Sequence, residues 1–140
     1  MQDSVCTAVD RHRTWLIAED ETVDQHWIER CIILGEYLVA ERNGQPVGFL
    51  RWSWFWGKIP YIDMIRVEPS LRRSGIGTLL LDHLQTSAIR QGAKMLLTSC
   101  ETSEQEPLDW HLGNGFKKVG EIEFPTVQNS SELFLAKRLD

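Results

Sequence analysis

The sequence predicts a mixed α/β domain with a largely antiparallel sheet, and three patterns support this prediction. Strand-like segments occupy most of residues 36–67 and are separated by two short turns. A turn with two glycines, at residues 72–77, leads directly into a segment with helical spacing. A strand, a short helix and two closing strands follow, so we expect one sheet flanked by helices.

Length and charge restrict the class of protein. The chain has 140 residues, of which 42% are hydrophobic, so we expect a single domain over residues 1–140. No apolar stretch approaches the roughly 18 residues of a membrane span, and the first residues lack a signal-peptide pattern. We therefore expect a cytoplasmic protein without a membrane partner. The net charge of -5 argues against nucleic acid as a partner.

The first third of the chain predicts a helix over residues 23–34. Thr22 and Gln25 have the form of a capping box, apolar residues then recur at helical spacing, and Gly35 offers a left-handed stop. Before this helix, the segment SVCTAV is typical of a short strand and RHRTWLIAEDE of a short helix.

Three antiparallel strands are expected next. The segments EYLVAE, PVGFLRWSWFW and YIDMIRV are rich in β-branched and aromatic residues. Asn43-Gly44 separates the first two as a hairpin turn, and residues 57–60 separate the second from the third. Such short connections favour a meander.

Helix and strand patterns alternate in the second half of the chain. Apolar residues recur at helical spacing over residues 76–89, and Gly92 ends this run. The segment KMLLTSC is typical of a buried strand, and SEQEPLDWHL of a short helix with Ser103 and Glu106 as a capping pair. The segments GFKKVGEIEF and SELFLAKRL are expected to close the sheet.

The turn that precedes the helix at residue 76 has the features of an anion site. Gly75 and Gly77 leave room for a ligand near the backbone, and the first helical turn has free N–H groups at a positive dipole end. Positive charge and hydroxyl donors flank the glycines at Arg72, Arg73, Ser74 and Thr78. The pattern predicts phosphate binding, and the alternative is a plain strand-to-helix turn.

Two other nucleotide-binding motifs do not fit this turn. A P-loop requires a lysine after its second glycine, and no lysine follows either glycine here. A dinucleotide fingerprint requires a third glycine, and Leu80 occupies that position.

The turn resembles the signature [Q/R]-x-x-G-x-[G/A] of the GCN5-related N-acetyltransferases (GNAT), in which it follows a strand and opens a helix. Here it reads Arg72-Arg73-Ser74-Gly75-Ile76-Gly77. The segment DWHLGNGF is similar to a second family feature, a short helix that ends in an aromatic-x-x-x-Gly-Phe pattern. The resemblance covers roughly residues 22–139 and implies a GNAT-like fold, in which the central pair of strands is splayed.

The resemblance also implies acetyl-CoA as cosubstrate. We expect no metal, because no acidic cluster near the turn indicates one. Main-chain N–H groups of residues 73–78 would hold its pyrophosphate, and residues 65–67 would pair with the pantetheine arm like an added strand. A main-chain N–H of the same strand would bind the oxyanion. The cofactor-binding residues implied in this way are Ile65, Arg66, Val67, Arg72, Arg73, Ser74, Gly75, Ile76, Gly77 and Thr78.

His111 stands where the family carries its usual general acid. That acid is a tyrosine four residues before the glycine of the Gly-Phe pair, and counting back from Gly115 leads to His111. A histidine can donate a proton or a hydrogen bond to the departing thiolate. It can equally pack where the tyrosine would lie, so both roles stay open.

Asp63 is the leading candidate for the general base. Strict alternation places it on the same strand face as Ile65 and Val67, near the expected thioester. In the histone-acetylating branch the base lies two residues earlier, and that position is Tyr61 here. Alternatives are that Asp63 only orients the acceptor or caps a turn, that a water chain acts instead, or that the base is Glu36, Glu68 or Glu101.

The aromatic, sulfur and imidazole side chains have less specific interpretations. Alternation places three tryptophans on one strand face: Trp52, Trp54 and Trp56. They either line an acceptor pocket or pack in the core, and Trp56 could more easily face a pocket because it lies near the strand end. The three cysteines are interpreted as buried free thiols: Cys6, Cys31 and Cys100. Three histidines lack metal-ligand spacing: His12, His26 and His83.

The leading functional hypothesis is an N-acetyltransferase that moves the acetyl group of acetyl-CoA to a primary amine by direct attack in a ternary complex. The acceptor is expected to be a small-molecule or peptide amine, and a homodimer is left open. A catalytically silent acyl-CoA-binding module is the alternative from another class, because His111 replaces the family tyrosine. An unrelated phosphate-binding domain is a more distant alternative.

Overall fold

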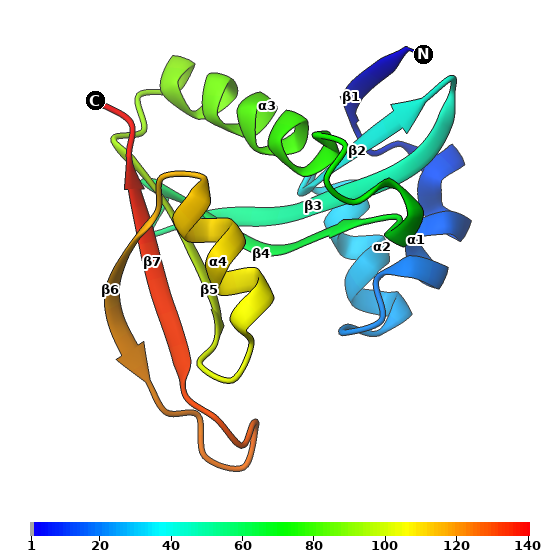
Figure 1. The fold of residues 1–140 in the computed structure, drawn as a ribbon. Helices are drawn as coiled ribbons and strands as arrows, with labels where there is room; N and C mark the ends of the chain where they lie inside the picture. The colour runs from blue at the N-terminus through cyan, green and yellow to red at the C-terminus, as the bar shows by residue number, and fades with distance from the viewer. Residues whose placement is uncertain (1) are drawn as a thin grey trace.

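A computed structural model describes residues 2–140 and contains one seven-stranded sheet in the order β1-β2-β3-β4-β5-β7-β6 (Figure 1). The strands are β1 (Asp3–Thr7), β2 (Tyr37–Arg42), β3 (Gln45–Phe55), β4 (Ile59–Val67), β5 (Met95–Glu101), β6 (Lys117–Ile122) and β7 (Glu132–Arg138). The helices are α1 (Arg13–Glu19), α2 (Gln25–Ile33), α3 (Ile76–Arg90) and α4 (Gln105–Gly113). The short 3-10 helices are η1 (Asp10–His12) and η2 (Pro69–Leu71).

The sheet consists of two antiparallel halves joined by one parallel pair. β3 and β4 pair antiparallel from Gly48↔Val67 to Phe55↔Ile59. β5 pairs with β7 along its whole length. Between these halves, β4 and β5 run parallel and share only the pairs Tyr61↔Leu97 and Ile62↔Thr98. The two strands therefore separate towards their C-terminal ends.

Helices cover the two faces of the sheet unequally. On one face, α3 and α4 pack over a core that spans both halves of the sheet, with Leu80 and Leu84 of α3 meeting Leu96 and Leu135. On the other face, α1 and α2 cover only the half formed by β1 to β4, where Leu16 and Ile28 pack against buried residues such as Phe49. Figure 1 shows α4 in front of β5 and β7, and α1 and α2 at the opposite half. Among residues 2–140, no helix covers the second face of β5, β7 and β6.

The expected order of elements is confirmed, including the short strand and short helix near the N-terminus. Three details differ. The N-cap of α2 is Asp24, whose carboxylate accepts from the N–H of Trp27, so the capping box from Thr22 does not form. Ser103 does not cap α4, because its hydroxyl bonds to that of Ser130.

The third difference concerns the tryptophan segment. β3 ends at Phe55, and Trp56 adopts a left-handed backbone with φ of 55° in the following turn. Alternation therefore stops before Trp56. A bulge between Arg51 and Trp52 interrupts the β3–β4 register as well.

The cysteines are free thiols, as expected, but only Cys31 and Cys100 are buried, while Cys6 is half-buried. Burial raises the pKa of Cys31 to about 11. Within residues 2–140, none of the helices has the length and apolar character needed to cross a bilayer.

Candidate functional site

A gap in the sheet lies between the C-terminal halves of β4 and β5. Beyond Ile62 and Thr98 the two strands share no further pairs, although each remains paired on its other side. The backbone groups of residues 63–67 that face β5 are thus left without strand partners. Because an extended ligand can bond to such an edge as an added strand, the gap is a candidate binding site.

The glycine turn starts at the same end of β4. Val67 ends the strand, η2 follows, and α3 begins at Ile76. Gly75 has φ of 89° and adopts the left-handed conformation that favours glycine. The first N–H groups of α3 have no partners within the helix, so they are available to an anion.

The side chains of the turn are solvent-exposed. Arg72 donates to the carbonyl of Val67 over 3.4 Å, and the Ser74 hydroxyl bonds to the Leu71 carbonyl. Arg73 has a left-handed backbone with φ of 66°. The two arginines add positive charge beside the α3 N-terminus, where the helix dipole is also positive.

Gly77 has a different role from Gly75, which the sequence did not indicate. A Cβ at Gly77 would lie 3.1 Å from Cζ2 of Trp110, so the absence of a side chain lets α4 pack closely on the first turn of α3. At Gly75, a Cβ would meet nothing within 4 Å. The first glycine of the motif therefore serves the turn, and the second serves helix packing.

His111 lies in α4 and is 7% exposed. Its ring makes edge contacts with those of Trp110 and Phe116, and its Nδ1 is buried without a hydrogen-bond partner among residues 2–140. Burial lowers the pKa of His111 to about 4, because the charged ring would lose its hydration. His111 is therefore neutral near pH 7.

Asp63 does not share a strand face with Ile65 and Val67, so the prediction from strict alternation is wrong. Arg51 pairs with Met64 and Trp52 pairs with Ile62, which leaves Asp63 as the extra residue of the bulge. Ile65 and Val67 pack towards the core under α3, whereas Asp63 bonds to Arg51 on the face that α1 and α2 partly cover. The bulge thus turns Asp63 to the other side of the sheet.

The Asp63 carboxyl is mostly buried, with 21% of its side chain exposed. Burial raises the pKa of Asp63 to about 6, although Arg51, at 3.3 Å, acts in the opposite direction. A carboxylate with a pKa near the working pH is suited to accept a proton from an acceptor.

The other candidate bases are engaged or exposed. Glu36 forms an ion pair with Arg30 at 2.9 Å. Glu101 accepts from the Ser130 hydroxyl at 2.8 Å. Glu68 is exposed at the start of the glycine turn.

Tyr61 and Ser99 connect β4 and β5 where the strands begin to separate, a contact that the sequence did not reveal. The Tyr61 and Ser99 hydroxyls lie 2.6 Å apart, and the Tyr61 ring stacks on Phe134 with centroids 6.2 Å apart. Burial raises the pKa of Tyr61, and the carboxylates of Asp63 and Glu132 also raise it, while the Ser99 bond lowers it. These residues form the surface on the open face of the sheet.

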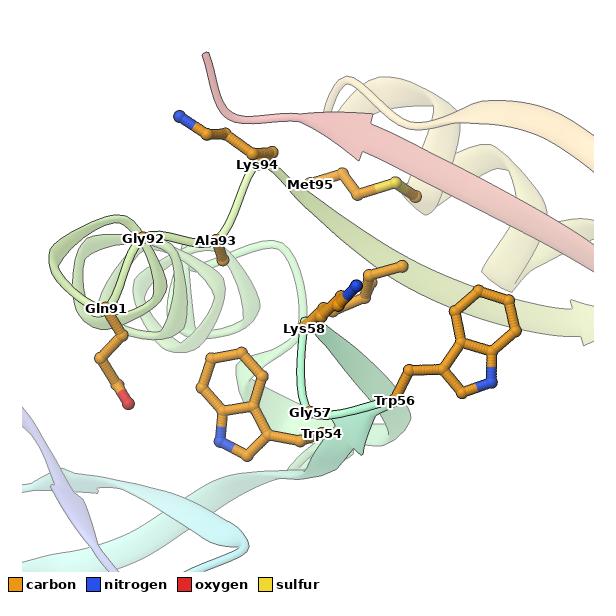
Figure 2. Close-up of a pocket in the computed structure, with 10 residues that line it drawn as sticks. Trp54, Trp56, Gly57, Lys58, Gln91, Gly92, Ala93, Lys94 and Met95 are labelled. Carbon is orange, nitrogen blue, oxygen red and sulfur yellow. The ribbon is translucent and has the colours of Figure 1, made fainter.

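The tryptophans split between core and pocket. Trp52 packs against the core under α3, and its indole N–H is buried without a partner among residues 2–140. Trp54 and Trp56 line a pocket of about 810 Å³ together with Lys58, Lys94 and Met95 (Figure 2). This pocket adjoins Ile59 and Met95, where β4 and β5 begin, so it lies at the opposite end of these strands from the gap.

Cys6, His12 and Glu41 come together although their spacing in the sequence did not suggest it. His12 Nδ1 accepts from the N–H of Val9, so Nε2 carries the proton and donates to Glu41 at 3.1 Å. Arg11 and then His12 hold the pKa of Glu41 at about 2. The ring nitrogen that faces Glu41 therefore presents a proton rather than a lone pair.

The family comparison agrees with this geometry. The profile of the Acetyltransferase (GNAT) family matches residues 6–116, which is most of the chain. The chain belongs to the GNAT family. The matched region includes the β4–β5 gap, the glycine turn, α4 and the residues that follow it up to Phe116.

Individual relatives of this GNAT chain are distant. S-(2-succino)cysteine N-acetyltransferase of Bacillus subtilis (strain 168) is 28% identical over 91 residues, or 59% of this chain and 55% of that relative. The match thus spans about half the length of this curated relative.

Two solved structures resemble the fold along nearly the whole chain. Ard1 from Thermoplasma volcanium is 16% identical with a TM-score of 0.86, covering 99% of this chain and 98% of that one. YncA from Salmonella typhimurium, solved with acetyl-CoA, is 20% identical with a TM-score of 0.78. The match covers 100% of this chain and 95% of that one.

Proposed function

We propose that residues 1–140 act as one acetyl-CoA-dependent N-acetyltransferase domain whose donor site is the β4–β5 gap together with the glycine turn. The observation that carries this proposal is the placement of both features at one end of β4: strand pairing to β5 stops after Ile62, and the turn follows Val67. Membership in the GNAT family supports the same reaction class. Acetyl-CoA would supply the activated acetyl group as a thioester.

The unpaired backbone and the glycine turn fit the two ends of this substrate. Residues Ile65 to Val67 have no strand partner on the β5 side, so their main-chain groups there can pair with the amide-rich pantetheine arm. The N–H groups at the start of α3 and the charges of Arg72 and Arg73 suit its pyrophosphate. A main-chain N–H in residues 65–67 would stabilise the oxyanion that develops during acyl transfer.

Asp63 is proposed as the general base. An alkyl ammonium must lose a proton before its nitrogen can attack the carbonyl carbon. Asp63 accepts this proton, either directly or through one water, and the pKa of about 6 leaves it largely ionised at pH 7. The new N–C bond forms as the C–S bond breaks, and the electron pair of that bond leaves on sulfur. The nitrogen loses its second proton to the departing thiolate, which gives the amide and the free thiol of coenzyme A.

His111 is proposed to assist the departing sulfur as a neutral ring. With a pKa of about 4 it carries one N–H near pH 7, so it can donate a hydrogen bond to the thiolate without first being an imidazolium. Its buried Nδ1 has no partner among the described residues, and a bound thioester would offer one.

The acceptor is proposed to be a small-molecule or peptide amine that binds on the open face near Tyr61, Ser99 and Phe134. Asp63 and Glu132 make this surface acidic, as their effect on Tyr61 indicates. Arg51, the buried cation beside it, is already bonded to Asp20 and Asp63. An acceptor with several carboxyl groups, such as the substrate in the name of the Bacillus subtilis relative, is therefore disfavoured.

Calorimetry and a thiol-release assay test the proposal. Acetyl-CoA and coenzyme A should bind, whereas nucleotides that lack pantetheine should bind much more weakly. Thiol release should rise when primary amines are added, and a broad panel of amines would identify the acceptor class. Equal binding of nucleotides without pantetheine would instead favour an unrelated phosphate-binding domain.

A catalytically silent acyl-CoA-binding module is the second candidate, and the burial of His111 favours it. A ring that is 7% exposed and in contact with Trp110 and Phe116 is also typical of a core side chain. Tight acetyl-CoA binding without turnover on any amine of the panel would support this module over the enzyme.

A further inference from the structure

Arg51 connects Asp63 to the buried core between β3 and α1. Its Nη1 donates to Asp63 at 3.3 Å, its Nε donates to Asp20 at 2.8 Å, and its Nη2 donates to the Thr22 hydroxyl at 3.3 Å. One guanidinium thus bonds to three residues from two segments, the connection between α1 and α2 and the strand β4. Its side chain is 7% exposed.

Asp20 holds this arginine from the buried side. The Asp20 side chain is 1% exposed, and its Oδ2 accepts both the Arg51 Nε–H and the Tyr37 hydroxyl, the latter at 2.5 Å. Tyr37 is fully buried and packs on Phe49. Because both anchoring groups are rigidly packed, the guanidinium has little freedom to turn.

The single charge of Arg51 is shared unequally between two carboxylates. Asp20 has the closer contact, and Asp63 has the longer one. Attraction between charges weakens with distance, and the negative charge of Asp20 repels the Asp63 carboxylate. Asp20 therefore offsets part of the stabilisation that Arg51 gives to that carboxylate. Asp63 lies at the bulge of β4, on the same face of the sheet as Arg51.

We propose that Arg51, anchored by Asp20 and Tyr37, is a positioning residue that orients Asp63, and that Asp20 keeps Asp63 basic by competing for the same guanidinium. This inference rests on the proposed role of Asp63 as the base. Neither Arg51 nor Asp20 needs to touch the substrates. The hydrogen-bond network that runs from Tyr37 to Asp63 acts only through the Asp63 carboxylate at its exposed end.

The groups that face Asp63 act on its pKa in opposite directions. Burial has the largest effect and raises the pKa of Asp63. Arg51 lowers this pKa, and Glu36 and Asp20 raise it. Loss of the Arg51 charge should therefore move the pKa of Asp63 up, and loss of the Asp20 charge should move it down. A purely structural role for either residue would not produce opposite shifts.

Carbon-13 NMR titration of aspartate carboxyl groups in the full chain measures these shifts without any acceptor, with Asp63→Asn used to assign the signal. We expect a midpoint near 6 in the unchanged protein. Arg51→Gln should raise the midpoint by roughly one unit and Asp20→Asn should lower it by a similar amount. Arg51→Lys should lie between the unchanged protein and Arg51→Gln, because it keeps the charge but not the fork geometry.

Arg42→Gln provides the matched control. Arg42 pairs with Asp3 at 2.8 Å at the β1–β2 edge and does not contact the network, so Asp63 should titrate as in the unchanged protein. If Arg51→Gln does not fold because Asp20 is left buried and unpaired, the double variant Asp20→Asn with Arg51→Gln removes both charges together. Its Asp63 midpoint should then fall between those of Asp20→Asn and Arg51→Gln.

The inference would be overturned if the Arg51 and Asp20 variants shifted the titration midpoint of Asp63 in the same direction. It would also be overturned if that midpoint stayed unchanged in folded variants. Failure of the proposed function has a different signature, because it appears as absent acetyl-CoA binding in the unchanged protein. The titration of Asp63 does not depend on that binding.

Discussion

The donor side and the acceptor side of the proposed site are built in different ways. The donor side uses one continuous stretch, from the end of β4 at Val67 through Gly75 to the start of α3 at Ile76. The acceptor side brings together Asp63 of β4, Ser99 of β5 and Phe134 of β7, which are distant in the chain.

Because of this difference, the two sides depend on distant residues to different degrees. Backbone N–H groups at a helix start bind an anion with little dependence on side chains elsewhere. On the acceptor side, the charge state of Asp63 depends on neighbours from other segments, including Arg51 and Asp20. Changes on the donor side should therefore act on binding, and changes on the acceptor side should act on chemistry.

The largest effect is expected from Gly75→Glu. A side chain at this left-handed position is strained, and a carboxylate at the anion site repels the pyrophosphate. Acetyl-CoA binding should fall at least 100-fold, as measured by calorimetry. Gly44→Glu is the matched control, because Gly44 also has a positive φ and open surroundings but lies in the β2–β3 turn. Equal loss in both variants would refute a specific donor role for Gly75.

Asp63→Asn should lower turnover while acetyl-CoA binding stays within about twofold. Loss of a general base typically costs on the order of 100-fold or more in rate. In the unchanged protein, kcat/KM should rise with pH through about 6, because the ionised carboxylate is the active form. A pH profile that keeps this step in Asp63→Asn would assign the base to another group.

His111→Phe should reduce turnover by about tenfold and leave acetyl-CoA binding intact, because it removes the N–H but keeps a packed ring. It should also change the acid stability of the fold. The pKa of His111 falls to about 4 on folding, so its contribution is complete above about 6.5 and is lost as the pH drops towards 4.

Urea unfolding at pH 7 and pH 5 measures this effect. Between pH 7 and pH 5, the free energy of unfolding should fall by ~2 kcal/mol more in the unchanged protein than in His111→Phe. This value follows because pH 5 lies about 1.5 units below the pKa of an unfolded histidine. Asp63 acts in the opposite direction, because its pKa rises on folding, so only the difference between the two proteins is diagnostic. Equal acid sensitivity in both would mean that His111 is not buried as a neutral ring.

The smallest effect is expected from Trp56→Ser. Trp56 is 77% exposed and lines the pocket at the start of β4 and β5, away from the gap. Acetyl-CoA binding and turnover should both change less than twofold. A large rise in KM for the amine, with binding of acetyl-CoA unchanged, would instead place the acceptor at the tryptophan pocket.

Local patterns sufficed to predict the order of elements. Hairpin turns such as Asn43-Gly44, helical spacing after Ile76 and the left-handed stop at Gly92 each act over a few residues, and all three appear in the structure. The cap of α2 was misassigned because Thr22 and Asp24 are both good capping residues. Only the geometry of the preceding turn selects between them.

Strand faces were harder to predict. Alternation assumes an unbroken strand, and one extra residue in β4 was enough to move Asp63 to the other face. The same limit applies to Gly77, whose small size serves a contact with Trp110 more than thirty residues away. Likewise, His12 and Glu41 meet only because strand β2 returns beside the N-terminal segment.

The sequence by itself determined the GNAT-like order of elements and the glycine turn before α3, because glycines, charged residues and helix starts act locally along the chain. Only the tertiary structure decided which side of the sheet Asp63 faces and that Arg51 and Asp20 meet it there. Those contacts depend on register and on packing between distant segments, and a few-residue pattern carries no information about either.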